Sequence, residues 1–410
     1  MAAEIKPLEQ NSDEIRSGFG RKLNLLSTIE GVPLDINMAV LLGGEEEGVA
    51  AVSEDKTVRI WLKKNKGKYW GSVCQHLPAT ASSIYYQKDK HKIYVGLNNG
   101  TVMDFVITDN GTKLSHIRDV LAHVDRITCI EVIPALKFVF TGSKDTYLQW
   151  HCSESGKKLG KFKIDVWISS LCFDLASKCL FVGDLSGQIT VLKMVEGSAH
   201  FITVLKGHTA SVRCLAWDNE NSLLFSGGGD NTIVVWDIGS RKGTTVELSG
   251  HQDRVECLIY IPTFKQLLSG GYDSNLIIWN MDAQRNSTPE WTESDKCECC
   301  NGPFFWNFKM MWEIKSLGGR QHHCRKCGKA ICAKCSSNVS ILPQYGFEYP
   351  VRLCLNCHAN LTSEELQPLA TFYHLKHRIV HADADINTKR LLTVGKDRVI
   401  KIWEMVDNWN

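Results

Sequence analysis

The chain has 410 residues, of which 43% are hydrophobic and 22% charged, and its formal net charge at pH 7 is +2. This near balance of charge argues against a generic nucleic-acid-binding protein, and no apolar run approaches the roughly 18 residues that a transmembrane helix needs. We therefore expect a soluble protein of one large or two smaller domains.

The N-terminal segment, residues 1–20, is rich in polar and small residues and contains no apolar stretch of the kind found in a secretory signal. We expect it to be a disordered tail. The segment that follows, Leu23–Ile29, can form a strand. Its place in the fold follows from the repeats described next.

An acidic turn residue followed by a short strand ending in tryptophan recurs along most of the chain. The four clear copies are Asp55–Trp61, Asp230–Trp236, Asp273–Trp279 and Asp397–Trp403. The intervals between them are filled by weaker copies, Asn99–Phe105 and Gly183–Leu192. The period is about 43 residues, and with the last copy the pattern predicts seven units.

A histidine and a hydroxyl residue precede the turn acid by the same spacing in three of the units: His123/Thr141/Asp145, His208/Ser226/Asp230 and His251/Ser269/Asp273. We interpret this set as a repeated hydrogen-bond network. Catalysis is the alternative interpretation. A catalytic histidine, however, would not be needed three times around a ring.

Each unit contains four short stretches of β-branched and aromatic residues separated by Gly, Asp and Asn. In one unit they are Thr203–Leu205, Ser211–Trp217, Leu223–Ser226 and Thr232–Trp236. One four-stranded sheet cannot bury both of its faces, whereas seven sheets packed radially can. The predicted fold is therefore all-β, a seven-bladed β-propeller.

Three dipeptides resemble the WD-repeat family: Gly207-His208 and Gly250-His251, which are 43 residues apart, and Trp236-Asp237. The resemblance covers most of residues 20–280 and 369–405 and implies that the histidine, serine, aspartate and tryptophan form that family's structural tetrad, which ties inner strands to a turn. We assign the propeller to residues 21–281 and 366–407.

The last repeat is displaced, because 124 residues separate Trp279 from Trp403 where about 43 are expected. We place an inserted domain at residues 285–362, after the third strand of the sixth blade, and expect the blade to resume at Leu369–Tyr373. The seventh blade then lacks an outer strand. Leu23–Ile29 can supply that strand and close the ring, which removes an open sheet edge.

Cysteines are concentrated in the insertion, where nine of the sixteen lie between Cys297 and Cys357. Eight of them suffice for two tetrahedral zinc sites, because they form the CxxC pairs Cys297/Cys300, Cys324/Cys327, Cys332/Cys335 and Cys354/Cys357. We interpret Cys299 as a bystander, since only Cys300 restores the CxxC spacing. A disulfide framework is the alternative, but the missing secretory segment and the scattered positions of the other cysteines favour a reducing compartment.

Basic residues and histidines lie beside these cysteines in Arg320–Gly328 (RQHHCRKCG). From Lys315 to Lys334 there are six Lys or Arg and no acidic residue. These bases could merely offset the charge of the zinc-bound thiolates, but that interpretation leaves the paired histidines unexplained. Because the cysteines alone fill both zinc sites, the histidines are free, and the cluster predicts a site for an anionic ligand.

The insertion resembles the FYVE finger family, whose signature is an R-R/K-H-H-C-R-x-C-G core, a later R-V-C and an upstream W-x-x-D. Arg320–Gly328 and Arg352–Cys354 match the first two, with one change in each. The resemblance implies a cross-braced finger with two Zn²⁺ ions, one held by Cys297, Cys300, Cys332 and Cys335 and the other by Cys324, Cys327, Cys354 and Cys357.

The same resemblance implies that the finger binds phosphatidylinositol 3-phosphate in membranes. It assigns headgroup contacts to Arg320, His322, His323, Arg325 and Arg352. The chemistry is reasonable on its own terms, because guanidinium groups make bidentate, charge-assisted contacts to phosphate and imidazoles can donate to phosphate or inositol oxygens.

The chain departs from the FYVE pattern in three places. Gln321 stands where the family usually has a second base, which removes one charge. Trp291 is not followed by an aspartate three residues later, so Asp295 or Glu293 would have to contact the inositol hydroxyls, and we favour Asp295.

The third departure is the long interval between the first two CxxC pairs, which holds the aromatic run Phe304–Trp312 and then Leu317. Leu317 aligns with the apolar loop that the family dips into the bilayer, which implies membrane insertion at this residue. Phe304 matches a phenylalanine of the family's small core. For the rest of the run we favour packing in the core or against the propeller, with insertion into the membrane as the alternative.

The whole arrangement resembles the WD-repeat and FYVE-domain-containing proteins of endosomes. That resemblance implies a cytosolic, non-enzymatic adaptor or scaffold, peripheral on early endosomal membranes, whose propeller is open to protein partners in trafficking or signalling, such as signalling kinases. Two alternatives stay open. One is a protein scaffold whose finger has lost lipid binding; the other is a RING-like ubiquitin ligase, although RING modules usually have histidine ligands and lack the Arg-x-His-His-Cys-Arg core.

Overall fold

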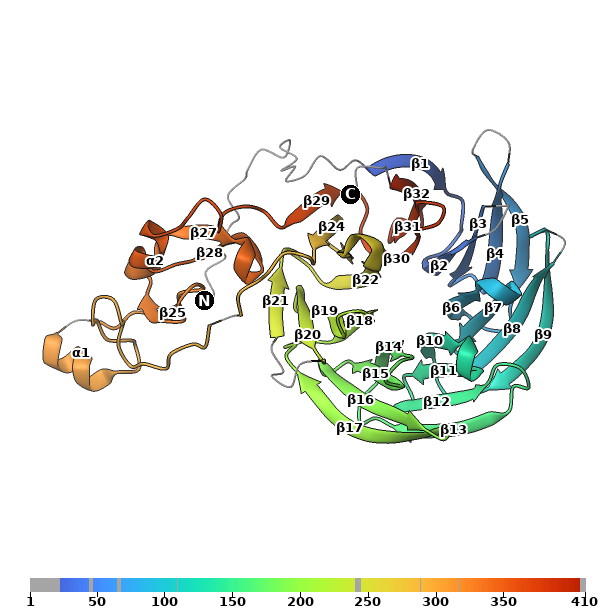
Figure 1. Ribbon diagram of the computed structural model, residues 1–410, viewed down its shortest axis with the longest axis horizontal. Helices are drawn as coiled ribbons and strands as arrows, with labels where there is room; N and C mark the ends of the chain where they lie inside the picture. The colour runs from blue at the N-terminus through green and yellow to red at the C-terminus, as the bar shows by residue number, and fades with distance from the viewer. Residues whose placement is uncertain are drawn as a thin grey trace.

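The larger part of the described chain is a ring of seven β-sheets around a central axis (Figure 1). The computed structural model describes residues 23–43, 47–64, 68–108, 110–239, 245–287, 289–315 and 317–405. Within those ranges the strands form seven sheets of four or more strands and one of two strands. The predicted all-β, seven-bladed propeller is confirmed, while the predicted tail at residues 1–20 lies outside the described residues.

The first four blades follow one another along the chain, each with its strands in sequence order. Their strands are β2 (Ile36–Leu42), β3 (Gly48–Ser53), β4 (Thr57–Lys63) and β5 (Tyr69–His76); β6 (Ala81–Gln87), β7 (Lys92–Leu97), β8 (Thr101–Thr108) and β9 (Lys113–Leu121); β10 (Ile127–Ile133), β11 (Phe138–Ser143), β12 (Tyr147–Cys152) and β13 (Lys158–Lys163); and β14 (Ile168–Asp174), β15 (Cys179–Asp184), β16 (Gln188–Val195) and β17 (Ser198–Lys206).

Blade 5 is also formed by consecutive strands, whereas blades 6 and 7 combine distant parts of the chain. Blade 5 contains β18 (Val212–Asp218), β19 (Leu223–Gly228), β20 (Thr232–Asp237) and β21 (Thr245–Ser249). Blade 6 contains β22 (Val255–Ile261), β23 (Gln266–Gly271), β24 (Asn275–Asn280) and β29 (Ala370–His374). Blade 7 contains β30 (Ile379–Asp385), β31 (Arg390–Gly395), β32 (Ile400–Met405) and β1 (Leu23–Ile29).

The insertion between β24 and β29 is called the finger here. Its elements are short: α1 (Phe308–Ile314), β25 (Gln321–His323), β26 (Ala330–Cys332), β27 (Val339–Leu342), β28 (Phe347–Arg352) and α2 (Leu355–Ala359). Single 3-10 turns complete the described structure at Lys88–Lys90, Pro134–Leu136, Pro262–Phe264, Lys334–Ser336 and Pro343–Tyr345.

Neighbouring blades pack closely because a glycine in the second strand makes room for the next blade. A Cβ on Gly227 would lie 2.7 Å from a methyl carbon of Val255, and one on Gly270 would lie 2.9 Å from a methyl carbon of Ile379. Val255 and Ile379 are fully buried. The ring is therefore held by close contact of β-branched side chains from one blade with the backbone of the previous one.

Histidine networks tie strands together within the blades. In blade 6, His251 Nε2 lies 2.8 Å from Ser269 Oγ, and its Nδ1 lies 3.1 Å from a carboxylate oxygen of Asp273. Trp279 donates its indole N–H to Ser269 Oγ at 2.8 Å. These are the repeated hydrogen-bond networks that the spacing predicted, and His123 and His208 make the same histidine contacts. At a position that the repeat analysis missed, His377 Nε2 lies 3.0 Å from Thr393 Oγ1.

The ring closes with the N-terminal strand, as the repeat spacing predicted. β1 pairs antiparallel with β32, with Leu23 opposite Met405. The finger leaves blade 6 after β24, and the blade is completed by β29, in which Ala370 lies opposite Trp279. The finger therefore hangs between the third and fourth strands of the sixth blade.

The finger docks on blade 5, a contact that the sequence did not predict. Its strands β28 and β27 extend the sheet of that blade to six strands among the residues described. β28 pairs in parallel with β21, with Phe347 opposite Ser249, and the Ser249 N–H donates to the Gly346 carbonyl oxygen at 2.8 Å. An outer sheet edge of the propeller is thus covered by the finger.

Side chains of the finger strand β28 also make contacts at blade 6. The rings of Tyr349 and Phe372 meet edge to face, with 5.6 Å between centroids. The buried Glu348 carboxyl accepts the backbone N–H of Leu369 at 3.0 Å, and burial raises the pKa of Glu348 to about 7. The finger is also joined to blade 6 at both of its ends, through β24 and β29. These connections and contacts together fix its orientation on the propeller.

The docking contact depends on Gly346, whose φ is +85° and at which a Cβ would lie 1.9 Å from the Glu247 carbonyl oxygen. We expect Gly346→Ala to open the contact, because both the conformation and the space exclude a side chain, which costs on the order of 1–3 kcal/mol. Hydrogen exchange at the Ser249 amide should become about tenfold faster or more.

The matched control is Gly197→Ala. Gly197 also has a positive φ, +82°, but nothing lies within 4 Å of its Cβ position. Gly197→Ala should introduce a similar backbone strain but leave hydrogen exchange at the Ser249 amide unchanged. An unchanged Ser249 amide in Gly346→Ala would contradict the docked arrangement.

Candidate functional site

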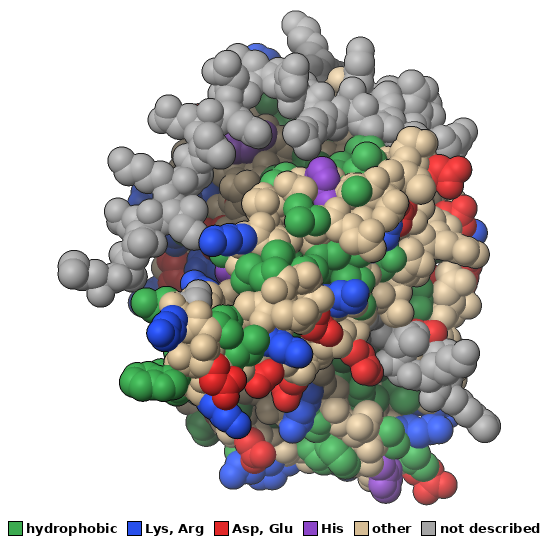
Figure 2. Space-filling model, turned by 90° about the vertical axis from the view of Figure 1, so that its left-hand side faces the viewer, with side chains coloured by type: hydrophobic (Ala, Val, Ile, Leu, Met, Phe, Trp, Pro, Cys, Tyr) green, Lys and Arg blue, Asp and Glu red, His purple; other side chains and the backbone are tan. Residues whose placement is uncertain are grey.

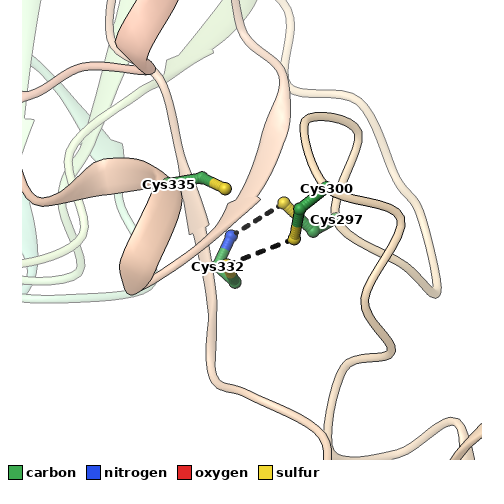
Figure 3. Close-up of side chains that lie close together, drawn as sticks. All are labelled: Cys297, Cys300, Cys332 and Cys335. Carbon is green, nitrogen blue, oxygen red and sulfur yellow. Dashed lines mark hydrogen bonds between the residues drawn. The ribbon is translucent and has the colours of Figure 1, made fainter.

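The eight predicted cysteine ligands form two groups in the finger. One group is Cys297, Cys300, Cys332 and Cys335, and within it the sulfur atoms all lie within 4.8 Å of one another (Figure 3). The other group is Cys324, Cys327, Cys354 and Cys357, whose sulfur atoms also lie within 4.8 Å of one another. The first CxxC pair thus joins the third and the second joins the fourth, which is the predicted cross-braced order.

The geometry of both groups fits zinc. In the first group the sulfur atoms of Cys300 and Cys332 are 3.7 Å apart, and in the second those of Cys327 and Cys354 are 4.0 Å apart. A tetrahedron with Zn–S bonds of about 2.3 Å has edges of roughly 3.8 Å. The Cys332 N–H also donates to Cys297 Sγ at 3.3 Å, which suits a thiolate. Two zinc ions can therefore be held by cysteine alone.

The finger has a core too small to fold by burial of apolar residues alone. Phe304, Ile331, Leu342 and Leu353 are fully buried there, beside the cysteine groups. The predicted core role of Phe304 is confirmed. Zinc binding would supply the remaining stability, since a structural zinc site contributes directly to the folding of a small domain.

The headgroup residues predicted from the basic motif lie on two faces of β25. Neighbouring residues of a strand point to opposite faces, so His322 lies on one face and Gln321 and His323 lie on the other. The latter two are within reach of each other, with 3.4 Å between Gln321 Nε2 and His323 Nε2.

The face of His322 is electropositive. Burial lowers the pKa of His322, and the positive charges of Arg352 and Arg320 lower it further. Arg352 also donates from Nη1 to the Ser336 carbonyl oxygen at 3.4 Å, which holds its guanidinium in place. The positive charges of Arg320 and Arg352 therefore act at His322, and the headgroup role of these three residues stays a prediction.

The face of His323 is built around an indole ring. Trp291 stacks on His323, with 4.7 Å between ring centroids and 10° between planes. The Arg325 guanidinium lies 4.5 Å from the Trp291 ring. Trp291 thus positions two of the predicted headgroup residues. Sequence reasoning treated it only as the start of an acid motif, and the motif itself held no signal for this stacking role.

A hollow of about 560 Å³ opens on this face, lined by Trp291, Glu293, Ser294, Asp295, Trp306, Gln321 and His323. Both candidate acids, Asp295 and Glu293, therefore lie beside His323. Asp295 is tied to the start of α1, because its carboxylate accepts a hydrogen bond from Asn307 Nδ2 at 2.9 Å.

The aromatic run forms an exposed helix at the end of the finger far from the propeller (Figure 1). Asn307 caps α1 by accepting the Met310 N–H, which explains why a helix starts there. Trp312 is 87% and Leu317 94% exposed. The favoured expectation that the run packs in the core or against the propeller is wrong beyond Phe304, because Phe305, Trp306, Phe308, Trp312 and Ile314 are all open to solvent.

Figure 2 views the molecule from the finger's end and shows hydrophobic side chains lying open among basic and acidic ones. Six large apolar residues belong to this exposed tip: Phe305, Trp306, Phe308, Trp312, Ile314 and Leu317. Surface apolar groups in such a cluster mark a contact site. None of the helices among the described residues is long and apolar enough to cross a membrane.

Two known sequence families match parts of the chain. The FYVE zinc finger family matches residues 289–363, and the family described as WD domain, G-beta repeat, matches residues 199–237 and 242–280. The crystal structure of the WD40 beta propeller domain of Doa1 superposes with a TM-score of 0.61 at 15% identity, covering 95% of this chain and 99% of that one, which supports the fold alone.

Full-length relatives share both parts. The chain is 48% identical over 405 residues to human WD repeat and FYVE domain-containing protein 2, with 99% of each chain covered. Identity to human WD repeat and FYVE domain-containing protein 1 is also 48%, covering 99% of this chain and 96% of the relative. Identity to the Caenorhabditis elegans protein 2 of the same name is 35%, covering 94% and 93%.

Zinc removal tests the cysteine assignment. We expect about two zinc ions per chain, and expect a chelator to unfold the finger while the propeller keeps its thermal transition, because only the finger depends on metal. Zinc content and near-ultraviolet circular dichroism would follow the two parts.

Neighbouring cysteines offer the matched control. Cys300→Ser should lower the zinc content to about one ion, whereas Cys299→Ser should keep both, because Cys299 is exposed and belongs to neither of the groups found among the described residues. Loss of zinc in Cys299→Ser alone would show that the ligands are misassigned.

Proposed function

The chain belongs to the family of WD repeat and FYVE domain-containing proteins, and we propose that it is an adaptor that binds phosphatidylinositol 3-phosphate in membranes through its finger. The observation that carries this proposal is that both metal-binding groups consist of cysteine only, while the basic motif lies between their members on β25 and next to it. The cysteines leave the bases and imidazoles of the motif free to bind an anion.

In this proposal the two faces of β25 take two parts of the headgroup. Arg320, His322 and Arg352 contact phosphate, since clustered guanidinium groups favour doubly charged oxyanions. His323 and Asp295 contact inositol hydroxyls from the hollow on the other face. Arg325 reaches the ligand from the Trp291 ring on which it lies.

The position of Gln321 supports lipid binding in spite of the missing base. Gln321 lies on the face of His323, within 3.4 Å of that ring, and so is directed away from the side of His322. The substitution therefore removes a charge that would attract the membrane from a distance, but it leaves Arg320 and Arg352 in place.

The exposed tip supplies a second contact with the membrane. Burial of one apolar side chain contributes roughly 1.5–3 kcal/mol, and tryptophan favours the interface between headgroups and acyl chains. Leu317 and Trp312 are the most exposed apolar residues of the tip. A headgroup site and an inserted tip together give the two signals that stable membrane residence requires.

The docked finger would give the propeller a defined pose on the membrane. The finger is fixed to blades 5 and 6, and its tip is directed away from the ring. Insertion of the tip would therefore hold the propeller beside the membrane and leave the surfaces of the ring open to partners. We propose a non-enzymatic scaffold, cytosolic and peripheral on early endosomes, that presents the propeller to proteins of trafficking or signalling, signalling kinases among them.

Vesicle binding of the full chain tests the lipid assignment. We expect tight binding to vesicles with phosphatidylinositol 3-phosphate and weak binding to vesicles with the 4-phosphate or the 4,5-bisphosphate at equal charge. Arg352→Ala should lower the affinity about tenfold or more, because it removes a charge-assisted contact. Arg398→Ala, which changes an exposed arginine of the propeller, is the control for net charge. Equal binding to all anionic vesicles would exclude the proposed specificity.

Replacement of a tip residue tests insertion. Trp312→Ala should weaken binding to the same vesicles about tenfold, and the loss should persist at high salt because burial of apolar surface is not screened. Trp70→Ala is the matched control, since Trp70 is also an exposed tryptophan, 57%, but lies on blade 1. If both variants bind alike, the tip does not enter the membrane.

A further inference from the structure

The channel through the middle of the propeller has basic and aromatic side chains at one of its ends. The channel has a volume of about 970 Å³, and the first strand of every blade contributes to its lining. The end where the first strands begin and the second strands end is called the mouth here. Its lining includes Arg126, Lys144, Trp167, Leu185 and Arg213.

The mouth lies at the end of the ring opposite to the one from which the finger leaves. In blade 6 the pair of Val255 and Gly271 marks the mouth end, where β22 begins and β23 ends. Gln266 marks the other end, because it pairs both with Ile261 and with Asn280, the last residue of β24. Neither connection of the finger therefore lies at the mouth.

On blades 3 and 4 the mouth combines exposed apolar side chains with a lysine. Trp167 directly precedes β14, and Lys144 and Leu185 directly follow β11 and β15. Trp167 and Leu185 are exposed, and the Leu185 N–H donates to the Trp167 carbonyl oxygen at 3.1 Å. Lys144 Nζ lies 4.8 Å from the centre of the Trp167 ring. An apolar patch thus has a positive charge beside it.

On blades 6 and 7 an aromatic ring is in contact with two arginines. The guanidinium carbons of Arg254 and Arg378 lie 4.0 Å and 5.1 Å from the centre of the Tyr272 ring. Stacking on a ring orients a guanidinium group but leaves its N–H edge able to donate to an anion. The two arginines are therefore oriented before any ligand binds.

The acidic side chains at the mouth are already bonded within the protein. Glu54 pairs with Arg126 at 3.7 Å, and Glu256 pairs with Arg213 at 2.7 Å and also with Arg254. Two exposed acids of the loops each accept the backbone N–H of the next residue: Asp125 and Asp253.

Lys144 and Arg378 are left without an acidic partner. Neither makes an ion pair with any residue that the structure describes, and each is in contact with an aromatic ring instead. Their charges are available to an anionic ligand, and Trp167 and Leu185 offer an apolar contact to the same ligand.

We propose that the mouth binds an acidic segment of a protein partner, whose carboxylates meet Lys144 and Arg378 and whose apolar side chain packs on Trp167 and Leu185. This inference deepens the proposed scaffold role and rests on it, but it does not depend on lipid binding. The charge of the mouth is complementary to such a segment, and aromatic and arginine side chains are frequent anchors of interfaces. The finger leaves from the other end of the ring, which favours a protein over the membrane as the ligand.

Peptide binding by the full chain in solution tests this inference. The probes are short fluorescein-labelled peptides rich in Asp and Glu with a central Leu, Phe or Ser, and matched peptides with Asn and Gln in place of the acids. Fluorescence anisotropy would measure their affinity for the wild type, Lys144→Glu, Arg378→Glu and Trp167→Ala. The control, Lys193→Glu, reverses an exposed charge of blade 4 at the other end of the ring. Zinc content and thermal unfolding check that each variant is folded.

We expect the acidic peptides with Leu or Phe to bind the wild type and Lys193→Glu alike, and Lys144→Glu and Arg378→Glu about tenfold or more weakly. Trp167→Ala should lose the preference for Leu or Phe over Ser, because it lacks the apolar surface. Vesicles with phosphatidylinositol 3-phosphate should bind these three mouth variants as they bind the wild type.

Three results would overturn the inference: no binding of any acidic peptide, equally tight binding of the Asn and Gln peptides, or an equal loss in Lys193→Glu. Weaker vesicle binding by the mouth variants, with peptide binding unchanged, would overturn it and assign this surface to the membrane. The lipid function fails separately. A wild-type chain that binds acidic peptides at the mouth but binds no vesicles supports this inference and overturns the proposed lipid binding.

Discussion

The backbone contact between Ser249 and Gly346 decides how the two parts of the protein relate to each other. A finger joined to the blade at both ends could point in many directions, but the parallel pairing of Phe347 with Ser249 fixes one orientation and register. The contact requires glycine at position 346, because φ is positive there and the nearby Glu247 carbonyl oxygen leaves no space for a side chain. The exposed tip, β25 and the propeller therefore hold fixed positions relative to one another.

Within the finger, metal coordination does what apolar burial does in a larger domain. The two cysteine groups interleave, so each joins segments that are distant in the chain and the short hairpin of β25 and β26 is held between them. Because no histidine is needed as a ligand, His322 and His323 are available on opposite faces of β25. In the proposed function, one strand of three residues presents one face to phosphate and the other to inositol hydroxyls.

Much of the fold and part of the site could be predicted from the order of the residues alone. The spacing of Asp273 and Trp279 and its copies predicted the blades, and the missing outer strand of the last blade predicted β1. The pairs of CxxC predicted the ligands. The packing expected for the aromatic run was wrong beyond Phe304, because the composition of an aromatic segment does not distinguish burial against a neighbour from exposure at a tip. The stacking of Trp291 with His323 and Arg325 was also missed.

By itself the sequence determined the ring of seven blades, the place of the insertion and the identity of the metal ligands. These are properties of strand periodicity and ligand spacing, which are local in the chain. Only the tertiary structure decided that the finger docks on blade 5, that α1 stays uncovered and that Trp291 stacks on His323. Each of these depends on which sheet edge and which side chains meet across distant segments, and backbone pairing between such segments leaves no mark in the local pattern of residues.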